Sequence, residues 1–214
     1  MSGVIIIGAG PGIGLAVARR FAREGLPVAL VARTERTMPG ARSFVADSTD
    51  EDALRTALDA AAAEFGTPDV LVYNAAIIQP DAPGELPARA QLDAWAVNVV
   101  GALTAASHVA PAMAARGRGT ILITGGMPEP NPRYVSLSLG KAGVRTLVAL
   151  LDAQYGAAGV HVASVTVAGP VAPGTAFDPD DIAEHYWSLH TQERPWSLEV
   201  VHDGRERGLI GGRG

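Results

Sequence analysis

The chain has 214 residues, of which 48% are hydrophobic, 18% charged and 5% aromatic, with no cysteine and a net charge of -5. This length and apolar content indicate one globular domain and exclude a disordered chain. The absence of cysteine excludes disulfides, a thiol nucleophile and a thiolate metal site. The negative charge gives no electrostatic reason to expect binding to nucleic acid or acidic membranes. We expect residues 1–203 to form the domain and residues 204–214 to form a flexible tail.

Neither a membrane span nor a signal peptide is expected. No run approaches the roughly 20 apolar residues that cross a bilayer. The first apolar run, Val4–Ile7, is short, and no basic residue precedes it. We therefore expect a cytoplasmic protein with no membrane partner.

Short apolar runs alternate with helical patterns along the whole chain. Near-continuous apolar runs predict strands at Val4–Ile7, Val28–Val31, Ser43–Ala46, Asp69–Tyr73, Thr120–Thr124, Val160–Val167 and Leu198–Val201. Apolar periodicity between them predicts helices at Gly12–Glu24, Asp50–Phe65, Pro87–Arg116, Val135–Tyr155 and Pro179–Gln192. Pro39-Gly40 makes a full helix between the second and third strands improbable. The order predicts an α/β fold, a doubly wound parallel sheet of about seven strands with helices on both faces.

Two of the predicted helices carry start signals. Ser48, with Glu51 three residues later, is a capping-box pattern for the helix that follows. Asp178 before Pro179 is the pattern of an N-cap followed by proline in the first turn.

A glycine-rich turn joins the first strand to the first helix. From Gly8 the sequence reads Gly-Ala-Gly-Pro-Gly-Ile-Gly, which fits a G-x-x-x-G-x-G spacing and not G-x-G-x-x-G. Glycines let a backbone approach a pyrophosphate, and a helix start offers free N–H groups and partial positive charge. A tight turn without a ligand is the alternative. The residues expected to bind a dinucleotide here are Gly8, Gly10, Gly12, Ile13 and Gly14.

Polar residues follow the next three strands at the points where those strands end. Arg33 stands where an acidic residue would bind the ribose 2′-hydroxyl of NAD. A guanidinium can instead pair with a 2′-phosphate, so NADP(H) is favoured over NAD(H), unless Arg33 is only a solvated surface charge. Because ligands of parallel sheets collect at strand carboxyl ends, the same cofactor is expected to meet Asp47, Ser48, Asn74 and Ala75.

Lysine occurs once, at Lys141, whereas arginine occurs 16 times. Base composition and chance explain such a bias without any function. The alternative is that this position needs a compact, titratable ammonium group and not a planar guanidinium.

Together these features resemble the short-chain dehydrogenase/reductase family over roughly residues 3–201. The resemblance implies a Rossmann-type sheet, a bound dinucleotide and hydride transfer. The glycine turn, Asp47 and Asn74-Ala75-Ala76 are similar to the family's cofactor motifs. The same resemblance assigns Gly169, Pro170 and Val171 to the cofactor, and catalytic roles to Asn98, Thr124 and Lys141, the last also as a ligand of the nicotinamide ribose.

The sequence departs from the family pattern at the reactive centre. The family has a proton-donating tyrosine four residues before its lysine, where this chain has Leu137. Loss of a positioned acid costs roughly 10²–10⁴ in rate. Tyr134 shares a face with Leu137 and Lys141 if the helix begins early enough, and could then replace the acid; otherwise it packs in the preceding loop. Ser136 and Ser138 face elsewhere and are expected to be solvated.

The region where the family inserts a substrate lid is short, because Pro173–Asp178 leads directly into the next helix. We expect an open pocket for a small-molecule substrate. His185 and His190 are five residues apart, a poor spacing for one metal ion, so no metal site is predicted. The resemblance also implies a homodimer or homotetramer in which the helices Pro87–Arg116 and Val135–Tyr155 pair between subunits.

Three hypotheses of function follow. The first is an NADP(H)-dependent short-chain oxidoreductase that transfers hydride to or from a small carbonyl or alcohol substrate, with an altered proton-donor site. The second is an enzyme that keeps the fold but performs non-redox chemistry, and the third is a non-catalytic cofactor-binding protein. Lys141 favours the first hypothesis, whereas Leu137 and the short lid favour the other two.

Overall fold

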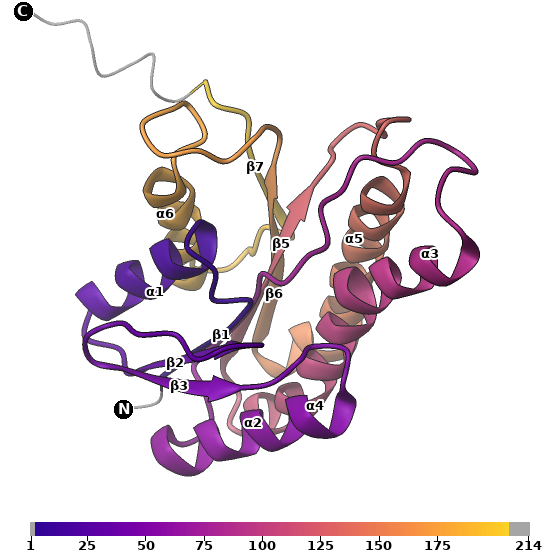
Figure 1. Ribbon diagram of the computed structural model, residues 1–214. Helices are drawn as coiled ribbons and strands as arrows, with labels where there is room; N and C mark the ends of the chain where they lie inside the picture. The colour runs from indigo at the N-terminus through magenta and orange to yellow at the C-terminus, as the bar shows by residue number, and fades with distance from the viewer. Residues whose placement is uncertain (1–2, 206–214) are drawn as a thin grey trace, which may run out of the picture.

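Seven apolar runs form one parallel sheet in the computed structural model, which describes residues 3–205 (Figure 1). The strands are β1 (Val4–Ile7), β2 (Val28–Ala32), β3 (Ala41–Val45), β4 (Val70–Tyr73), β5 (Gly119–Gly126), β6 (Val160–Val167) and β7 (Glu199–His202). They lie in the order β3-β2-β1-β4-β5-β6-β7, and every neighbouring pair is parallel. The predicted doubly wound α/β fold is confirmed, with the strand order reversing between β1 and β4.

Helices cover both faces of this sheet (Figure 1). They are α1 (Ile13–Arg23), α2 (Glu51–Phe65), α3 (Ala88–Trp95), α4 (Gly101–Ala115), α5 (Val135–Tyr155) and α6 (Pro179–His190). The helix predicted at Pro87–Arg116 is divided, because a π-helical turn, η1 (Ala96–Val100), separates α3 from α4. A 3-10 turn, η2 (Gly156–Ala158), follows α5. No helix lies between β2 and β3, as the Pro39-Gly40 pair predicted.

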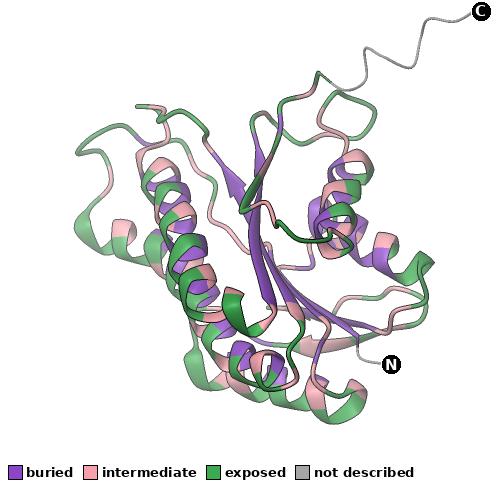
Figure 2. Ribbon diagram, turned by 180° about the vertical axis from the view of Figure 1, so that it is seen from behind, coloured by how far each residue is buried: buried purple, intermediate pink, exposed green. Residues whose placement is uncertain are grey.

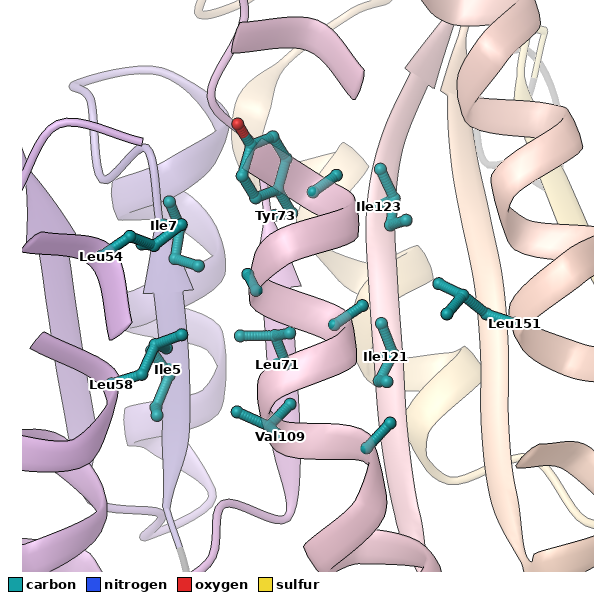
Figure 3. Close-up of a cluster of buried hydrophobic side chains, with 14 of the residues drawn as sticks. Ile5, Ile7, Leu54, Leu58, Leu71, Tyr73, Val109, Ile121, Ile123 and Leu151 are labelled. Carbon is teal, nitrogen blue, oxygen red and sulfur yellow. The ribbon is translucent and has the colours of Figure 1, made fainter. Parts of the chain in front are cut away.

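The core consists of two apolar layers, one on each face of the sheet. Strand residues such as Ile5 and Ile7 pack with α2, α4 and α5 on one face (Figure 3). Their alternating neighbours, such as Ile6, pack with α1 and α6 on the other face. Each such side chain contributes about 1.5–3 kcal/mol when fully buried. Figure 2 shows the buried positions concentrated on the strands and on the inner sides of the helices.

The helical stretch Ala88–Ala115 is long and apolar enough to cross a membrane by length and composition alone. The sequence had predicted no membrane-spanning segment. Half of the apolar window is buried inside the protein, as in the core helix of a sheet-based fold. Ala105 and Ala106 are fully buried in the layer that α4 forms against the sheet.

One of the two predicted helix starts is confirmed and the other is wrong. Asp178 caps α6, because its carboxylate accepts a hydrogen bond from the Asp180 amide at 2.9 Å. Ser48 does not cap α2. That helix begins two residues later than the capping box requires, and the Asp50 carboxylate accepts from the Ala53 amide at 3.0 Å. Of the expected tail, residues 204–214, the part 206–214 lies outside the described residues.

Candidate active site

The carboxyl ends of β1 and β4 meet at the point where the strand order reverses. Gly8 has a φ of +84°, and a Cβ added to it would overlap the backbone nitrogen of Ala75. A Cβ on Gly14 would overlap the carbonyl oxygen of Gly8. The Asn74 side chain donates to that same carbonyl at 2.9 Å. The turn itself therefore requires glycine at positions 8 and 14.

The other two glycines of the turn face open space. A Cβ added to Gly10 or Gly12 would meet no atom within 4 Å. Gly12 is the N-cap residue of α1, which begins with Ile13. A helix start in front of open space can hold an anionic group. Glycines that the fold does not need on steric grounds fit a cradle for a pyrophosphate.

A cleft of about 870 Å³ runs along the carboxyl ends of β1 to β4. The expected cofactor residues that line it are Gly8, Gly10, Arg33, Asp47, Ser48, Asn74 and Ala75. Ile13 and Gly14 instead form the buried start of α1 beneath the turn. The structure thus brings residues from four separate strand ends, and from both sides of the strand reversal, into one groove.

The rim of this cleft carries two arginines. Sequence reasoning found Arg33 but missed Arg36, which lines the same cleft. The Nε atom of Arg36 is buried without a hydrogen-bond partner among the described residues. A buried donor without a partner is costly, so this atom fits a site that receives an acceptor from a ligand. The signal in the sequence was the short spacing between the two arginines.

The carboxylate of Asp47 is held in its ionised form. The Thr49 amide and hydroxyl donate to it at 2.9 and 2.8 Å. These hydrogen bonds, the amide one above all, and the nearby Arg33 charge lower the pKa of Asp47 below its usual range, although burial opposes them. The cleft therefore presents one fixed acceptor beside two cationic side chains.

Lys141 lies on α5 and is not among the residues that line the cleft. Its side chain is buried, and Nζ donates to the backbone carbonyl of Thr124 at 2.7 Å. Gly126, at the end of β5, leaves room beside it, since a Cβ there would lie 3.6 Å from Lys141 Cε. Burial lowers the pKa of Lys141 to about 8. The ammonium group thus remains mainly protonated, and a donor, at neutral pH.

The Thr124 hydroxyl is not brought together with Lys141. It donates to Asn74 Oδ1 at 2.8 Å and pairs with the Tyr186 hydroxyl at 2.6 Å. Tyr186 belongs to α6, which covers the other face of the sheet. Side chains alternate along a strand, so Thr124 shares the face of Leu122. Only its backbone carbonyl faces Lys141.

Asn98 lies in the π-helical turn, directly beside α5. Its Oδ1 accepts from the Ile77 amide at 2.8 Å, and its Nδ2 donates to the Ile77 carbonyl at 3.3 Å. A Cβ added to Gly140 would lie 2.8 Å from Asn98 Cβ. This close approach packs η1 against α5 at the residue before Lys141.

Tyr134 does not meet the condition for sharing a helical face with Leu137 and Lys141. The helix α5 begins at Val135, and Tyr134 is its N-cap residue with a φ of -145° and a ψ of 59°. Leu137 is buried one turn before Lys141. Tyr134 lies outside the helix, and its backbone angles are not helical. Helical spacing therefore does not place the Tyr134 hydroxyl on the face of Leu137.

The start of α5 depends on a residue that sequence reasoning missed. Asp81 is 1% exposed, and its carboxylate accepts hydrogen bonds from the Ser136 amide at 2.9 Å and the Ser136 hydroxyl at 3.1 Å. Gln91 donates to it at 3.2 Å. The expectation that Ser136 is solvated was wrong, because this distant carboxylate caps the helix. No local pattern around Asp81 indicates the contact.

The residues Gly169, Pro170 and Val171 follow β6 and are not part of the cleft lining. A Cβ on Gly169 would overlap the ring of Phe177. The Ala172 amide donates to the Phe177 carbonyl at 3.2 Å, which closes the short segment into a turn before α6. A tight turn therefore occupies the segment between β6 and α6, where the sequence predicted a shortened lid.

The comparisons with known proteins agree with this geometry. The family model described as short chain dehydrogenase matches residues 2–178. The chain belongs to this family. Curated relatives include the cis-4-hydroxycyclohexanecarboxylate dehydrogenase of Sinomonas cyclohexanicum, 36% identical over 82% of this chain and 73% of the relative. Another is the L-tagatose-forming galactitol 2-dehydrogenase of Cereibacter sphaeroides, 33% identical over 96% of this chain and 81% of the relative.

Solved structures show the same short-chain dehydrogenase fold. A metagenomic short-chain oxidoreductase in complex with NADP aligns with a TM-score of 0.82 and 27% identity, over 94% of this chain and 97% of that chain. A putative short-chain dehydrogenase/reductase from Burkholderia xenovorans aligns with a TM-score of 0.86 over 95% of each chain. The chain therefore belongs among the oxidoreductases of the short-chain type.

The two kinds of glycine in the turn predict different effects of alanine. Gly8→Ala should lower the free energy of unfolding by about 2 kcal/mol or more, because positive φ and overlap with Ala75 both oppose a Cβ. Gly10→Ala should leave the melting temperature nearly unchanged but weaken binding of the dinucleotide, NADH or NADPH, at least about tenfold, because its Cβ enters the cleft. Thermal melts and calorimetric titrations measure both. Equal loss of stability in the two variants would contradict this division.

The buried lysine predicts a pH dependence of stability. Its folded-state pKa of about 8 lies below the ordinary 10.5, so between these values the unfolded chain binds more protons than the folded chain. The free energy of unfolding should therefore rise with pH, by about 2 kcal/mol from about pH 7 to about pH 9.5. Denaturant titrations across this range measure it. Lys141→Met should lack this rise, and a parallel pH profile in that variant would contradict the assignment.

Proposed function

We propose that this protein is an NADP(H)-dependent oxidoreductase that transfers hydride between the cofactor and a small carbonyl or hydroxyl compound. The observation that carries the proposal is the arginine-rimmed cleft at the reversal of strand order. Arg33 and Arg36 line it, and no carboxylate stands at the end of β2, where one would bind a ribose 2′-hydroxyl. Two guanidinium groups suit a 2′-phosphate.

The chain's own residues divide the work of holding the cofactor. The glycine turn and the start of α1 would receive the pyrophosphate, and the two arginines the 2′-phosphate. Asp47 would accept from the adenine, and Lys141 would donate to the hydroxyls of the nicotinamide ribose, as the family resemblance implies. When bound, the dinucleotide supplies or accepts the hydride. The relatives named above suggest secondary alcohols as first substrates, beginning with cis-4-hydroxycyclohexanecarboxylate and galactitol.

The proposed reactive centre has an altered proton-donating site. Leu137 fills the position one turn before Lys141, and its aliphatic side chain has no acidic proton to donate. The Thr124 hydroxyl is engaged with Asn74 and Tyr186 on the other face. Tyr134, at the start of α5, is the remaining phenol near this helix among the candidates, and water is the alternative proton source. A site of this kind should reduce ordinary ketones slowly.

The two exposed sides of α4 and α5 support a proposal of self-association. Large apolar side chains remain exposed on these two helices and on the preceding α3; they are Leu92 and Trp95 on α3, Leu103 on α4, and Leu139 and Leu150 on α5. Contiguous exposed apolar residues are typical of interfaces. We propose a homodimer or homotetramer that covers them.

Cofactor selectivity tests the role of the arginine rim. The native protein should bind NADPH more tightly than NADH, and Arg33→Ala should reduce that preference by about 10- to 100-fold, the equivalent of about 1–3 kcal/mol. Arg42→Ala is the matched control, since Arg42 pairs with Glu64 and lies outside the cleft lining. Calorimetric titration with both cofactors measures the ratio. A native protein that prefers NADH would contradict the proposal.

Restoring a phenol tests the altered reactive centre. Leu137→Tyr places a hydroxyl one turn before Lys141, whose charge favours the phenolate and lowers its pKa. Reduction of 4-oxocyclohexanecarboxylate with NADPH should rise at least about tenfold, within the range that general acids supply. Thr146→Tyr, at an exposed position further along the same helix, is the control and should change nothing.

Removing the remaining phenol completes this test. If Tyr134→Phe abolishes turnover, Tyr134 is the donor; if turnover persists, the proton comes from water. A native protein that reduces the ketone fast and is unchanged by Leu137→Tyr and by Tyr134→Phe would show that the assignment of the reactive centre is wrong.

A further inference from the structure

The π-helical turn η1 changes the hydrogen bonding of the helix on which Asn98 lies. In an α-helix the Gly101 amide would donate to the carbonyl of Val97, four residues earlier. Here it donates to the carbonyl of Ala96, five residues earlier. Such single π-turns occur inside helices, often at functional sites. The Val97 carbonyl, directly before Asn98, therefore lacks its ordinary α-helical donor.

A phenol from the sheet takes the place of that donor. Tyr73 is the last residue of β4, and its hydroxyl donates to the Val97 carbonyl at 2.5 Å. The Tyr73 side chain is 2% exposed, and Figure 3 shows its ring at one end of the aliphatic cluster, with the hydroxyl directed away from it. Burial raises the pKa of Tyr73 to about 12, so the hydroxyl remains a donor through the neutral range.

The backbone around the turn is shaped to admit this hydroxyl. A Cβ added to Gly101 would overlap Tyr73 Oη and would also lie 2.6 Å from the Ser48 carbonyl. Glycine at position 101 thus leaves the space that the phenol occupies. Gly101 has no positive φ, so the close approach of Tyr73 is the reason for a glycine here.

The turn held in this way fixes the orientation of Asn98. Both polar atoms of the Asn98 side chain bond to the backbone of Ile77, and its Cβ packs on Gly140 of α5. If η1 shifted toward a regular α-helix, residue 98 would rotate about the helix axis. This rotation would break the Ile77 contacts and alter the distance to Lys141.

We propose that Tyr73 is a positioning residue of the reaction site, whose hydroxyl holds the π-helical turn and thereby holds Asn98 against Ile77 and beside α5. The effect of Tyr73 on turnover rests on the proposed function, whereas its effect on Asn98 does not. Tyr73 acts through Asn98 and need not touch the substrate.

The test is Tyr73→Phe, read by amide hydrogen exchange. The Ile77 amide should exchange at least about tenfold faster, because its acceptor is Asn98 Oδ1, while the Val72 amide within β4 should remain protected. Thr166→Val is the matched control, since it also removes a buried hydroxyl bond, to Glu199 between β6 and β7 and away from η1. It should leave Ile77 exchange within about twofold of the native rate. An unchanged Ile77 rate in folded Tyr73→Phe overturns the proposal.

A second variant and a second measurement keep the test decisive. Gly101→Ala displaces the phenol without deleting it and should also accelerate Ile77 exchange; a native exchange rate in this folded variant likewise overturns the proposal. With NADP⁺ and cis-4-hydroxycyclohexanecarboxylate, Tyr73→Phe should lower kcat at least about fivefold, and by a larger factor than it weakens NADP⁺ binding, because the Tyr73 hydroxyl also contacts Ser48 in the cleft. An equal loss in kcat and cofactor affinity contradicts positioning through Asn98. Faster exchange in a protein that never binds NADP⁺ would overturn the proposed function and leave the Tyr73 contact standing.

Discussion

The side chain of Asn74 joins the carboxyl ends of three strands, and the rest of the site depends on this junction. It donates to the Gly8 carbonyl after β1, accepts from the Thr124 hydroxyl on β5, and itself follows β4. Backbone hydrogen bonds pair these strands up to their last residues, and the Asn74 backbone amide donates to the Ile7 carbonyl at 2.8 Å. The Asn74 side chain adds a further tie beyond those bonds, between the glycine turn and β5.

Two opposing requirements meet at this junction. The glycine turn must approach Ala75 so closely that no Cβ fits on Gly8, while the space in front of Gly10 and Gly12 must stay open. Close packing behind the turn and open space in front of it are both consequences of the strand reversal between β1 and β4. The proposed reactive centre is built differently, from α5 and η1, and the start of α5 is held by hydrogen bonds to the distant Asp81.

The sequence was sufficient for the fold because the fold depends on periodicity. Apolar runs and helical spacing placed all seven strands and most helix ends, and β1, β6 and α5 have the predicted bounds. The division of the long helix by η1 was not predictable, since the Tyr73 hydroxyl that contacts the turn comes from β4, far away in the sequence. The bounds of α2 were predicted to within one residue, but its cap was misread, because Ser48 and Asp50 are both good caps and only the backbone path decides between them.

The site was predictable where it follows strand ends and not where it depends on side-chain direction. Arg33 and Asp47 line the cleft as expected, because chain order fixes which edge of the sheet they reach. The Thr124 hydroxyl points to one face of β5, and the sequence alone does not indicate that this is the face covered by α6, where the hydroxyl meets Tyr186. The cap on α5 joins positions 81 and 136, which no local pattern connects.

The central claim is that this chain carries a hydride-transfer site whose proton donor has been altered, and isotope transfer tests it most directly. NADPH deuterated at the transferable position of the nicotinamide is incubated with 4-oxocyclohexanecarboxylate, and the product is examined by mass spectrometry. We predict deuterium at the carbinol carbon, formed slowly by the native protein and faster by Leu137→Tyr. Tight binding of NADPH without deuterium in the product, in both proteins, would contradict the account.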